Sequence, residues 1–583
     1  MYKVKKEMPK HTFYIESEKR LQRAALTEIS SVNGVSVYRA DFAFENGVES
    51  GTIGISMRFP MKNILQIFAP TTDFKRNRMV WQWFNPTSML SSFASGLPSL
   101  SAVKDGKNNY VTVAASEAEC KCTTEFFADD FFGNDEVVFR LWLFQDFEQK
   151  NDYRVFIRID ERDIPLSETL REQTQWFSEF YHSEGSYPEA CEYPLYSTWY
   201  NFHQNPSAAK LKKELIVARE LGFRSVILDD GWQSDGTGSS GYESCGDWEF
   251  SKEKFPDVKE FLSFVHSLDM KIVLWFSVPF VGNKSSVYER FKDKFLYKYY
   301  DGTGILDVRY KEAREFVVNT VCRLMKYGFD GMKLDFIDSF KLQKDSPVYN
   351  DKMDTKEVSA ATVKLVSDLY NAIKSVNREA MIEFRQDYVG PSIVRFGNML
   401  RVADCAFDSI TNRIGIADLR MLNYNLAIHS DMLYWTKSES DENVARQLTN
   451  IMFGVPQISV LLNEDSRSHK EVIKKFIEYW EANKNILLHG KFETEGEDCT
   501  YSMLAAKGKD KAIVALYLKN YYTYKGKNAD IFNGTSEEKI YIDAGRFSCN
   551  AKIYDCKNRL AEERSISGLT AINVPLGGRV ELR

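Results

Sequence analysis

Four segments of the chain place acidic residues directly after short apolar runs, where strands of a sheet would end. They read LDDGWQ (228–233), KLDFID (333–338), EFRQD (383–387) and ADCAFD (403–408). The carboxyl ends of parallel barrel strands meet at one rim, so these carboxylates would crowd together. Crowded carboxylates cost free energy unless cations, ligands or catalysis justify them. The pattern therefore indicates a functional acidic rim.

Cleavage of a glycosidic bond is a reaction that needs two such groups. One carboxylate attacks the anomeric carbon, and a carboxylic acid protonates the leaving oxygen. Lys333 lies two residues before Asp335, and positions i and i+2 of a strand share a face. The ammonium would keep Asp335 ionised, as a nucleophile must be. The acid/base should instead have a raised pKa, from partial desolvation or a neighbouring negative charge.

Single residues of this rim have simpler interpretations. An acidic residue after a strand is often a helix N-cap, and Asp408, before SITNRIGIADLR, fits that role. Asp338 is interpreted as structural or supporting. Tryptophans near strand ends could wall a sugar pocket, although each one alone is better explained by packing: Trp199, Trp232, Trp275 and Trp435. Together with the carboxylates they favour a saccharide.

Other chemistries find less support. The seven histidines form no HxH or HExxH pair, and no Gly-x-Ser-x-Gly elbow is present, which disfavours zinc and serine hydrolases. His203 is a lone histidine, a kind that is more often structural. A net charge of -6 without a basic tract disfavours nucleic acid or membrane partners. No metal or cofactor is implied.

The chain carries no sign of export or membrane insertion. Its first residues lack an apolar stretch, and no window approaches the roughly 20 apolar residues of a membrane span. The nine cysteines are odd in number and scattered. We therefore expect a cytoplasmic protein with a glycoside or oligosaccharide as its partner; homo-oligomerisation stays open.

Hydrophobic patterning divides the chain into three domains. Residues 1–185 alternate apolar and polar positions between turn residues, which predicts an antiparallel β-sandwich, with a helix over about 167–182 leading out of it. Residues 489–583 predict a small C-terminal β-sandwich. Residues 186–488 alternate strands with amphipathic helices.

The central region predicts a (β/α)₈ TIM barrel. Its strand candidates are LYSTWYNF (195–202), SVILDDGW (225–232), KIVLWFSV (271–278), GMKLDFID (331–338), MIEFRQD (381–387), LRVADCA (400–406), MLYWT (432–436) and ISVLLNE (458–464). GILDVR (304–309) could be a ninth strand, but we interpret Asp307 as a turn or cap before the next helix. An open doubly wound sheet is less favoured, because no Gly-rich phosphate loop follows a strand.

At these motifs the sequence resembles glycoside hydrolase family 36, the α-galactosidase and raffinose-synthase family. The matching segments are LDDGWQ, GDWEFSKEKFPD (246–257), KLD (333–335) and RVADCAFD (401–408); FKRNRMVWQWFNP (74–86) is distantly similar to the raffinose-synthase branch. The resemblance implies Asp335 as nucleophile and Asp404 as acid/base. It also implies sugar-binding or pocket-lining roles for Asp229, Asp230, Trp232, Lys333, Trp199, Asp247, Trp248, Trp275, Arg385 and Asp408.

Two segments depart from the family pattern. A Cys-Ser-Gly-Gly-Gly-Arg-like segment is expected after strand five, but the chain reads EFRQDYVGP, with Arg385 as the counterpart of the arginine. A Pro-Glu segment expected after strand three is replaced by LWFSVPFVG. The resemblance implies hydrolysis of a terminal α-galactoside with retention. Galactosyl transfer, an α-N-acetylgalactosaminide substrate and, least favoured, a non-catalytic sugar-binding barrel stay as alternatives. Trp81 or Trp83 could reach over the pocket mouth.

Overall fold

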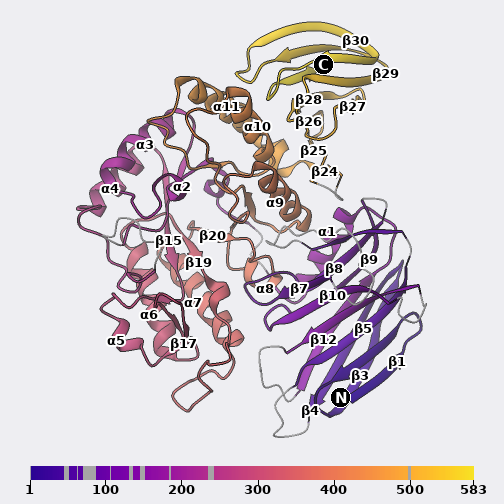
Figure 1. The fold of residues 1–583 in the computed structure, drawn as a ribbon, viewed down its shortest axis with the longest axis vertical. Coiled ribbons are helices and arrows are strands. Elements are labelled where there is room, and N and C mark those ends of the chain that lie inside the picture. Colours follow the sequence, from indigo (N-terminus) through magenta and orange to yellow (C-terminus); the bar gives the residue numbers. More distant parts are fainter. Residues whose placement is uncertain are drawn as a thin grey trace.

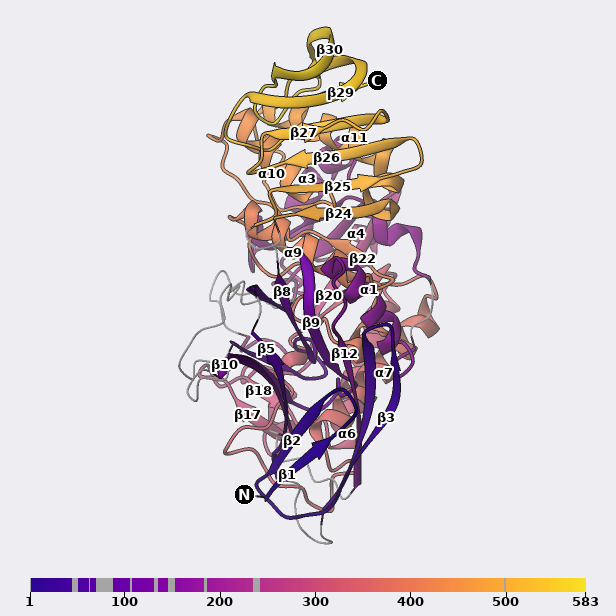
Figure 2. The same cartoon turned by 90° about the vertical axis from the view of Figure 1, so that its right-hand side faces the viewer.

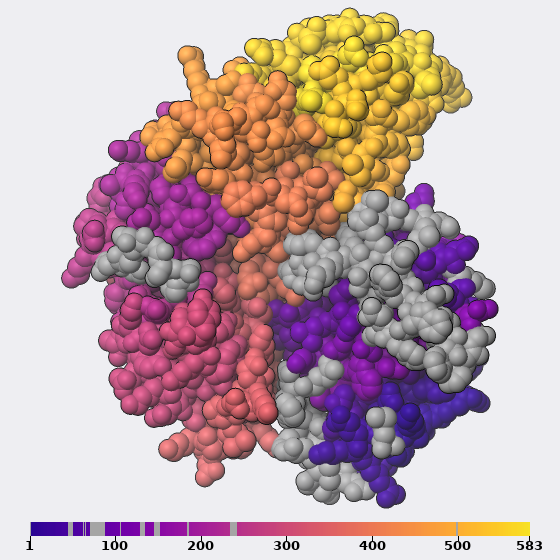
Figure 3. All heavy atoms as spheres, viewed as in Figure 1, coloured from indigo at the N-terminus to yellow at the C-terminus, as the bar shows by residue number. Residues whose placement is uncertain are grey.

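The computed structural model describes residues 2–44, 51–61, 63–69, 87–104, 107–129, 135–144, 152–182, 186–233, 242–496 and 500–583. An N-terminal β-sandwich packs beside a (β/α)₈ barrel, and a C-terminal sheet lies at the far end of the long axis (Figures 1 and 3). The predicted TIM barrel with flanking β domains is thus confirmed. The segment with Trp81 and Trp83 lies outside the described residues.

The N-terminal sandwich consists, in the described ranges, of two antiparallel six-stranded sheets. One sheet runs β1 (Tyr2–Glu7), β2 (Thr12–Ser17), β5 (Ile53–Pro60), β11 (Glu136–Leu143), β10 (Cys122–Asp129) and β7 (Thr87–Ser91). The other runs β3 (Leu21–Val32), β4 (Val35–Phe44), β12 (Asp152–Asp160), β9 (Asn108–Ala115), β8 (Ser99–Lys104) and β6 (Ile64–Phe68). Strands of the two sheets, among them β1, β2, β5, β9 and β12, lie together at the N-terminal end of the molecule (Figure 2). Alternate residues such as Phe13 and Ile15 are buried in one core, which explains the period of two in the sequence.

Eight parallel strands of the described chain form the barrel. Their order is β22 (Ala427–His429), β21 (Met399–Arg401), β20 (Met381–Arg385), β19 (Gly331–Asp335), β15 (Lys271–Ser277), β14 (Ser225–Leu228), β13 (Leu195–Ser197) and β23 (Gln457–Ile458). A parallel bridge between His429 and Val455 brings the two edges together. Most residues of these strands are buried, as expected for parallel strands covered by helices.

A helix follows each barrel strand and returns the chain to the opposite rim. These helices are α3 (Ala208–Glu220), α4 (Val258–Ser267), α6 (Lys311–Met325), α7 (Val358–Val376), the short α8 (Pro391–Val394), α9 (Ser409–Leu422), α10 (Asp441–Ile451) and α11 (Arg467–His489). Side chains of Ser207, Asp257, Asp408, Ser440 and Ser466 accept backbone N–H groups at their first turns. Such N-caps satisfy donors that the helix leaves unpaired.

Short elements fill the connections. They are α1 (Leu166–Phe177), η1 (Glu189–Glu192), α2 (Trp199–Phe202), α5 (Tyr288–Phe291), η2 (Ile337–Ser339) and a small sheet of β16 (Phe280–Val281), β17 (Phe295–Lys298) and β18 (Gly304–Leu306). The segment GILDVR thus contributes a strand to the small sheet instead of the barrel. Asp307 lies in a turn before α6, as the first of the two interpretations predicted, because its carbonyl accepts the Tyr310 N–H. It does not cap α6; its carboxylate binds the Arg309 guanidinium.

The seventh barrel strand was predicted wrongly. It comprises Ala427–His429, whereas the predicted MLYWT lies beyond its end and joins Ile458 only through an isolated bridge from Leu433. The aromatic run attracted the prediction because aromatic residues favour strands in general. The first strand also ends early, at Ser197, and α2 takes up the rest of the predicted segment.

The C-terminal strands form one sheet path. It contains β24 (Lys491–Glu495), β25 (Met503–Lys507), β26 (Lys511–Leu516), β28 (Asn528–Asn533), β31 (Arg579–Leu582), β29 (Lys539–Tyr554) and β27 (Tyr521–Thr523), with β30 (Leu560–Asn573) paired to β29. Residues from both halves of β29, including Ile542 and Ile553, share one core with Val514. The domain boundaries proposed at 185 and 488 fall between β12 and β13 and in the last turn of α11. Within the described residues, no helix has the length and hydropathy to cross a bilayer.

Strands β19 and β20 lie so close together at Gly331 that any side chain there should destabilise the fold. A Cβ there would lie 2.0 Å from the carbonyl oxygen of Met381 on the paired strand. Gly331→Ala should therefore cost at least about 1–3 kcal/mol of unfolding free energy and lower the Tm. Gly508→Ala, whose nearest neighbour would be the Ile486 side chain at 3.2 Å, is the control in thermal unfolding. Equal Tm values for the two variants would contradict this reading of the strand packing.

Candidate active site

Asp335 lies at the carboxyl end of β19 and is surrounded by donors. Its carboxylate accepts hydrogen bonds from the Arg385 Nε at 2.7 Å, the Phe336 N–H at 2.8 Å and the Trp275 Nε1 at 3.0 Å. Burial alone would raise the pKa of Asp335, but the charges of Arg385 and Lys333 outweigh it and hold that pKa well below its ordinary value. Asp335 is therefore ionised at neutral pH, as was predicted for a nucleophile.

The residue after Asp335 adopts an unusual backbone conformation. Phe336 has a φ of 61°, in the left-handed region that a bulky residue rarely occupies. This turn aims its N–H back at the Asp335 carboxylate, in the hydrogen bond described above. Strain next to a reactive group is characteristic of functional sites, because the surrounding structure must hold it in place.

Arg385 joins Asp335 to Asp338. Its Nη2 donates to Asp338 Oδ1 at 2.8 Å, and the Tyr388 hydroxyl donates to the same oxygen at 2.9 Å. The guanidinium also lies over the rings of Phe336 and Tyr388, 5.6 Å and 5.0 Å from their centroids. Stacking and pairing together fix Arg385. Asp338 thus supports the site through Arg385, as its sequence interpretation suggested.

Lys333 and the aspartate pair after β14 form the floor of the site. The Lys333 ammonium donates to Asp229 Oδ2 at 2.7 Å, and both side chains are buried. Burial lowers the pKa of Lys333, but Asp229 and Asp335 more than offset this, so the ammonium stays charged. Asp230 is 2% exposed and accepts from Gln204, Gly231 and Gln233; burial raises its pKa.

Asp404 lies on the opposite side, in the loop after β21, with its side chain 64% exposed. Arg401 Nη2 donates to Asp404 Oδ1 at 2.9 Å, and Arg401 Nη1 donates to Asp431 Oδ1 at 2.5 Å. The enclosing barrel mouth raises the pKa of Asp404, yet the charges of Arg401 and Lys333 outweigh it and hold the pKa below its ordinary value. The prediction of a raised pKa for Asp404 is therefore wrong for this structure, because the sequence pattern did not reveal that Arg401 pairs with Asp404.

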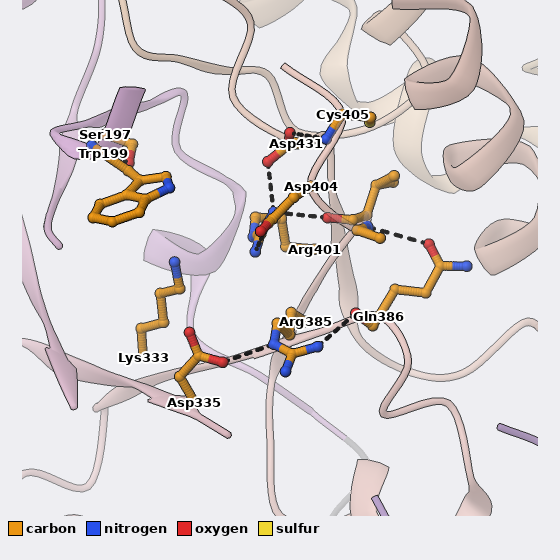
Figure 4. Close-up of polar contacts among 12 residues, drawn as sticks. Ser197, Trp199, Lys333, Asp335, Arg385, Gln386, Arg401, Asp404, Cys405 and Asp431 are labelled. Atoms are coloured by element: carbon orange, nitrogen blue, oxygen red, sulfur yellow. Dashed lines mark hydrogen bonds and ion pairs between the residues drawn. The ribbon is translucent and has the colours of Figure 1, made fainter. Parts of the chain in front are cut away.

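These groups face a common space. Figure 4 shows Lys333, Asp335 and Asp404 directed toward one another, with the Trp199 indole of α2 along one side. Trp275 contacts Asp335 directly through its indole N–H. Together with Asp229, Asp230 and Arg385, which are described above, eight of the twelve predicted site residues are thus gathered at one rim.

Other predicted site residues do not reach this space. Trp232 and Trp248 are 0% and 1% exposed and pack on Phe250 and Phe276, behind the barrel strands. Asp247 uses both carboxylate oxygens on Ser286 and the Val287 N–H. The structure thus assigns these three residues to packing and loop support, and a sequence motif cannot distinguish such buried positions from pocket walls.

Asp408 is an N-cap. Its carboxylate accepts the N–H groups of Ile410 and Thr411, both at 3.0 Å, at the start of α9. The simpler interpretation of this residue holds, and its expected contact with substrate is not supported, because helix α9 uses the carboxylate.

Two charged residues of the site escaped the sequence reasoning: Arg401 and Asp431. Arg401 lies within a strand, where it was passed over as a member of an apolar run. Asp431 was missed because the seventh strand was placed too late, so that this residue preceded the strand instead of following it. A basic residue inside a buried strand is the signal that could have found Arg401.

Among the described residues, no group of three or more His, Cys, Asp or Glu side chains is arranged to hold a metal ion. The acidic groups of the rim are paired instead with Lys333, Arg385 and Arg401. The site therefore has the chemistry of a carboxylate pair with organic cations beside it.

Comparison with known proteins shows which proteins the barrel region is similar to. Residues 167–392 match the family model described as Melibiase. The predicted resemblance to glycoside hydrolase family 36 is confirmed. The α-galactosidase Mel36A of Lactobacillus acidophilus is 24% identical over 192 residues, and α-galactosidase 1 of Pediococcus pentosaceus is 31% identical over 98 residues. These alignments cover 31% and 17% of this chain but only 24% and 13% of the relatives.

Solved structures of family 36 share the whole fold. The α-galactosidase AgaA of Geobacillus stearothermophilus, in complex with raffinose, has a TM-score of 0.67 over 98% of this chain and 83% of its own, at 13% identity. The Lactobacillus brevis α-galactosidase has a TM-score of 0.63 over 98% and 81%, at 13% identity. At this identity the superpositions establish the fold, including both flanking β domains.

The pairing of Asp335 predicts a pH-dependent contribution to stability. The pKa of Asp335 is lower in the folded than in the unfolded chain, so its ionisation stabilises the fold above the unfolded pKa. That contribution is lost as the pH falls through the folded value. Asp335→Asn should therefore cost about 3 kcal/mol of unfolding free energy at pH 7, and the difference from wild type should shrink towards pH 3.

Chemical denaturation at several pH values measures this difference. Asp338→Asn is the matched control, because Asp338 binds the same arginine but is 33% exposed and should cost less. A difference between wild type and Asp335→Asn that stays constant from pH 7 to 3 would show that the charge of Asp335 does not stabilise the fold.

Proposed function

We propose that this protein is a retaining α-glycosidase that hydrolyses terminal α-linked galactosides. The observation that carries the proposal is the buried, ionised Asp335 facing the solvent-accessible Asp404 across the barrel rim, with Lys333 between them (Figure 4). The Melibiase match and the relatives named α-galactosidases support galactose as the sugar.

In the first step, Asp335 attacks the anomeric carbon and forms a β-galactosyl ester. The glycosidic C–O bond breaks, and the proton of Asp404 goes to the leaving oxygen. In the second step, Asp404 removes a proton from water, whose oxygen attacks the same carbon while the ester bond to Asp335 breaks. Two inversions give net retention, and both carboxyl groups return to their starting states. This mechanism predicts carboxyl groups roughly 5–6 Å apart.

Asp229, Asp230 and Lys333 are proposed to hold the hydroxyls of the galactosyl ring, with Trp199 and Trp275 along it. Lys333 can donate to a sugar hydroxyl while it keeps Asp229, because an ammonium has three N–H groups. Arg385 would lie closest to the reacting carbon, since it contacts the nucleophile itself. This arginine stands in the segment that departs from the family pattern, and we propose that it shapes the pocket around the sugar.

The described cysteines fit action in a reducing compartment such as the cytoplasm. Six of them are free: Cys191, Cys245, Cys322, Cys405, Cys549 and Cys556. Structural disulfides are rare in the cytosol and common in secreted proteins. A cytoplasmic location is therefore part of the proposal.

A panel of aryl α-glycosides tests the reaction and the sugar. We expect aryl alcohol release from the α-galactoside and not from the glucoside, and α-galactose as the first product by NMR. Asp335→Gly should lower kcat by at least about 10⁴-fold. Added azide should restore release of the aryl group and yield β-galactosyl azide, because a small anion can occupy the emptied nucleophile position.

Asp404→Gly with azide should instead give α-galactosyl azide, since there the anion replaces the water of the second step. Asp338→Asn is the control that leaves both proposed catalytic carboxylates in place. Release of β-galactose by the wild type would disprove retention. Release of N-acetylgalactosamine alone would move the proposal to that sugar, and products transferred to added sugars would move it to galactosyl transfer.

The contact between Arg401 and Asp404 leads to a prediction for kcat/KM on the alkaline side of its pH profile. The acid form of Asp404 is needed in the first step, and Arg401 lowers its pKa, so kcat/KM should fall as the pH rises. Arg401→Gln removes the positive charge, raises the pKa of Asp404 and should move this limb upward by about one pH unit. Arg401→Lys retains the charge and should leave the limb near its wild-type position.

Both variants need a parallel Tm measurement, because Arg401 also pairs with the buried Asp431. An alkaline limb that is unchanged in Arg401→Gln would show that Asp404 is not the group that titrates there.

A further inference from the structure

Phe407 is an apolar side chain where burial would be expected. It is 79% exposed, and among the described phenylalanines it alone is exposed. Its neighbours Ala406 and Val402 are 2% and 0% exposed. It lies three residues after Asp404, in the loop between β21 and α9. Its ring contacts Tyr200, whose pKa is raised by burial and by the nearby charges of Asp431 and Asp404.

The loop holds this ring outward. At one end, the Cys405 N–H donates to Asp431 Oδ2 at 2.6 Å, next to Asp404 (Figure 4). At the other end, the Asp408 N–H donates to the Cys405 carbonyl at 2.9 Å, and its carboxylate caps α9. With both ends tied, Phe407 occupies a fixed turn, and its exposure follows from the backbone instead of from local flexibility.

Two more aromatic rings support Phe407 from the sides. The Tyr200 ring, on α2, is 6.2 Å from it at an interplanar angle of 59°. The Tyr434 ring, after β22, is 5.4 Å away at 76°. Edge-on neighbours of this kind stabilise an aromatic ring without stacking on it. Three loops of the barrel rim thus contribute to one aromatic group, which we name the Phe407 platform: Tyr200, Phe407 and Tyr434.

The position of the platform indicates what it contacts. The galactosyl ring must lie against Asp335 and Lys333, at the floor of the site. Both residues are buried, with exposed fractions of 8% and 4%. Asp404 must reach the oxygen that links this ring to the departing group. A ring on the Asp404 side is therefore next to the departing group, and an exposed aromatic ring can pack against the apolar C–H face of a pyranose.

We propose that the Phe407 platform is the subsite for the sugar that leaves in the first step and for a sugar acceptor in the second. This inference rests on the proposed α-galactosidase activity and assigns residues of this chain to the subsite beyond the galactosyl ring. Water must still reach the ester in hydrolysis, and the exposure of Asp404 allows it. A sugar held on the platform would place its hydroxyl where that water attacks.

Two substrates distinguish the contribution of the Phe407 platform to kcat/KM from that of the rest of the site. α-Galactosyl fluoride has a leaving group without a ring, whereas an α-1,6-galactosyl-glucose disaccharide presents one. We expect Phe407→Ala to lower the ratio of kcat/KM for the disaccharide to that for the fluoride by about tenfold, the size of one aromatic contact. Phe407→Trp should keep or increase the wild-type ratio. The fraction of transfer products with added glucose should fall in Phe407→Ala as well.

Tyr541→Ala is the control, because Tyr541 is an exposed aromatic residue, 37% exposed, on β29 of the C-terminal sheet. It should leave the ratio unchanged, and Tm values should show all variants folded. An unchanged ratio in Phe407→Ala, or an equal loss on both substrates, would overturn the platform. If the wild type turned over neither substrate, the α-galactosidase proposal itself would fail, and the inference with it.

Discussion

The arrangement of the barrel rim depends on opposite charges that are buried together. An unpaired ion in a protein interior costs several kcal/mol, so each buried charge must find a partner when the barrel closes. Lys333 forms an ion pair with Asp229, Asp335 with Arg385, and Arg401 with Asp431. Each pair joins different strands. The same contacts that allow the charges to be buried therefore also fix the relative positions of the groups that we propose for catalysis.

Strand register decides which charges can meet. Lys333 is paired with Glu383 across β19 and β20, and Arg385 with Arg401 across β20 and β21. Two arginines side by side would repel each other, yet each turns to a different carboxylate: Arg385 to Asp335, and Arg401 to Asp404. The rim is thereby divided into two halves. The half with Asp335 is buried and its carboxylate accepts three donors, whereas the half with Asp404 is open to solvent on one side.

The sequence was informative where a short buried strand is followed directly by, or ends in, an acidic residue. The runs before Asp229 and Asp335 are of this kind, and both residues lie at the rim as predicted. Prediction failed for the seventh strand, which has only three residues and yields to the more aromatic MLYWT segment beside it. It failed again for Trp232 and Trp248, since only packing decides whether a tryptophan near a strand end faces the pocket or the helices.

The N-terminal sandwich contacts the segment of the barrel that follows Arg385. Ser95 Oγ donates to Asp387 Oδ2 at 2.9 Å, and the Gly96 N–H donates to the Asp387 carbonyl at 2.9 Å. Asp387 lies two residues after Arg385, in the segment that departs from the family pattern.

Gly96 is required for this contact. Its φ is +66°, and a Cβ would lie 2.1 Å from the Leu90 carbonyl, so a larger residue would push the loop away from the barrel. The loop that follows Arg385 is thus held from outside the barrel, and Arg385 in turn holds the Asp335 carboxylate. A change of the pocket after β20 therefore needs a matching surface on the sandwich. This coupling gives a physical reason for the sandwich and the barrel to form one body instead of two independent domains.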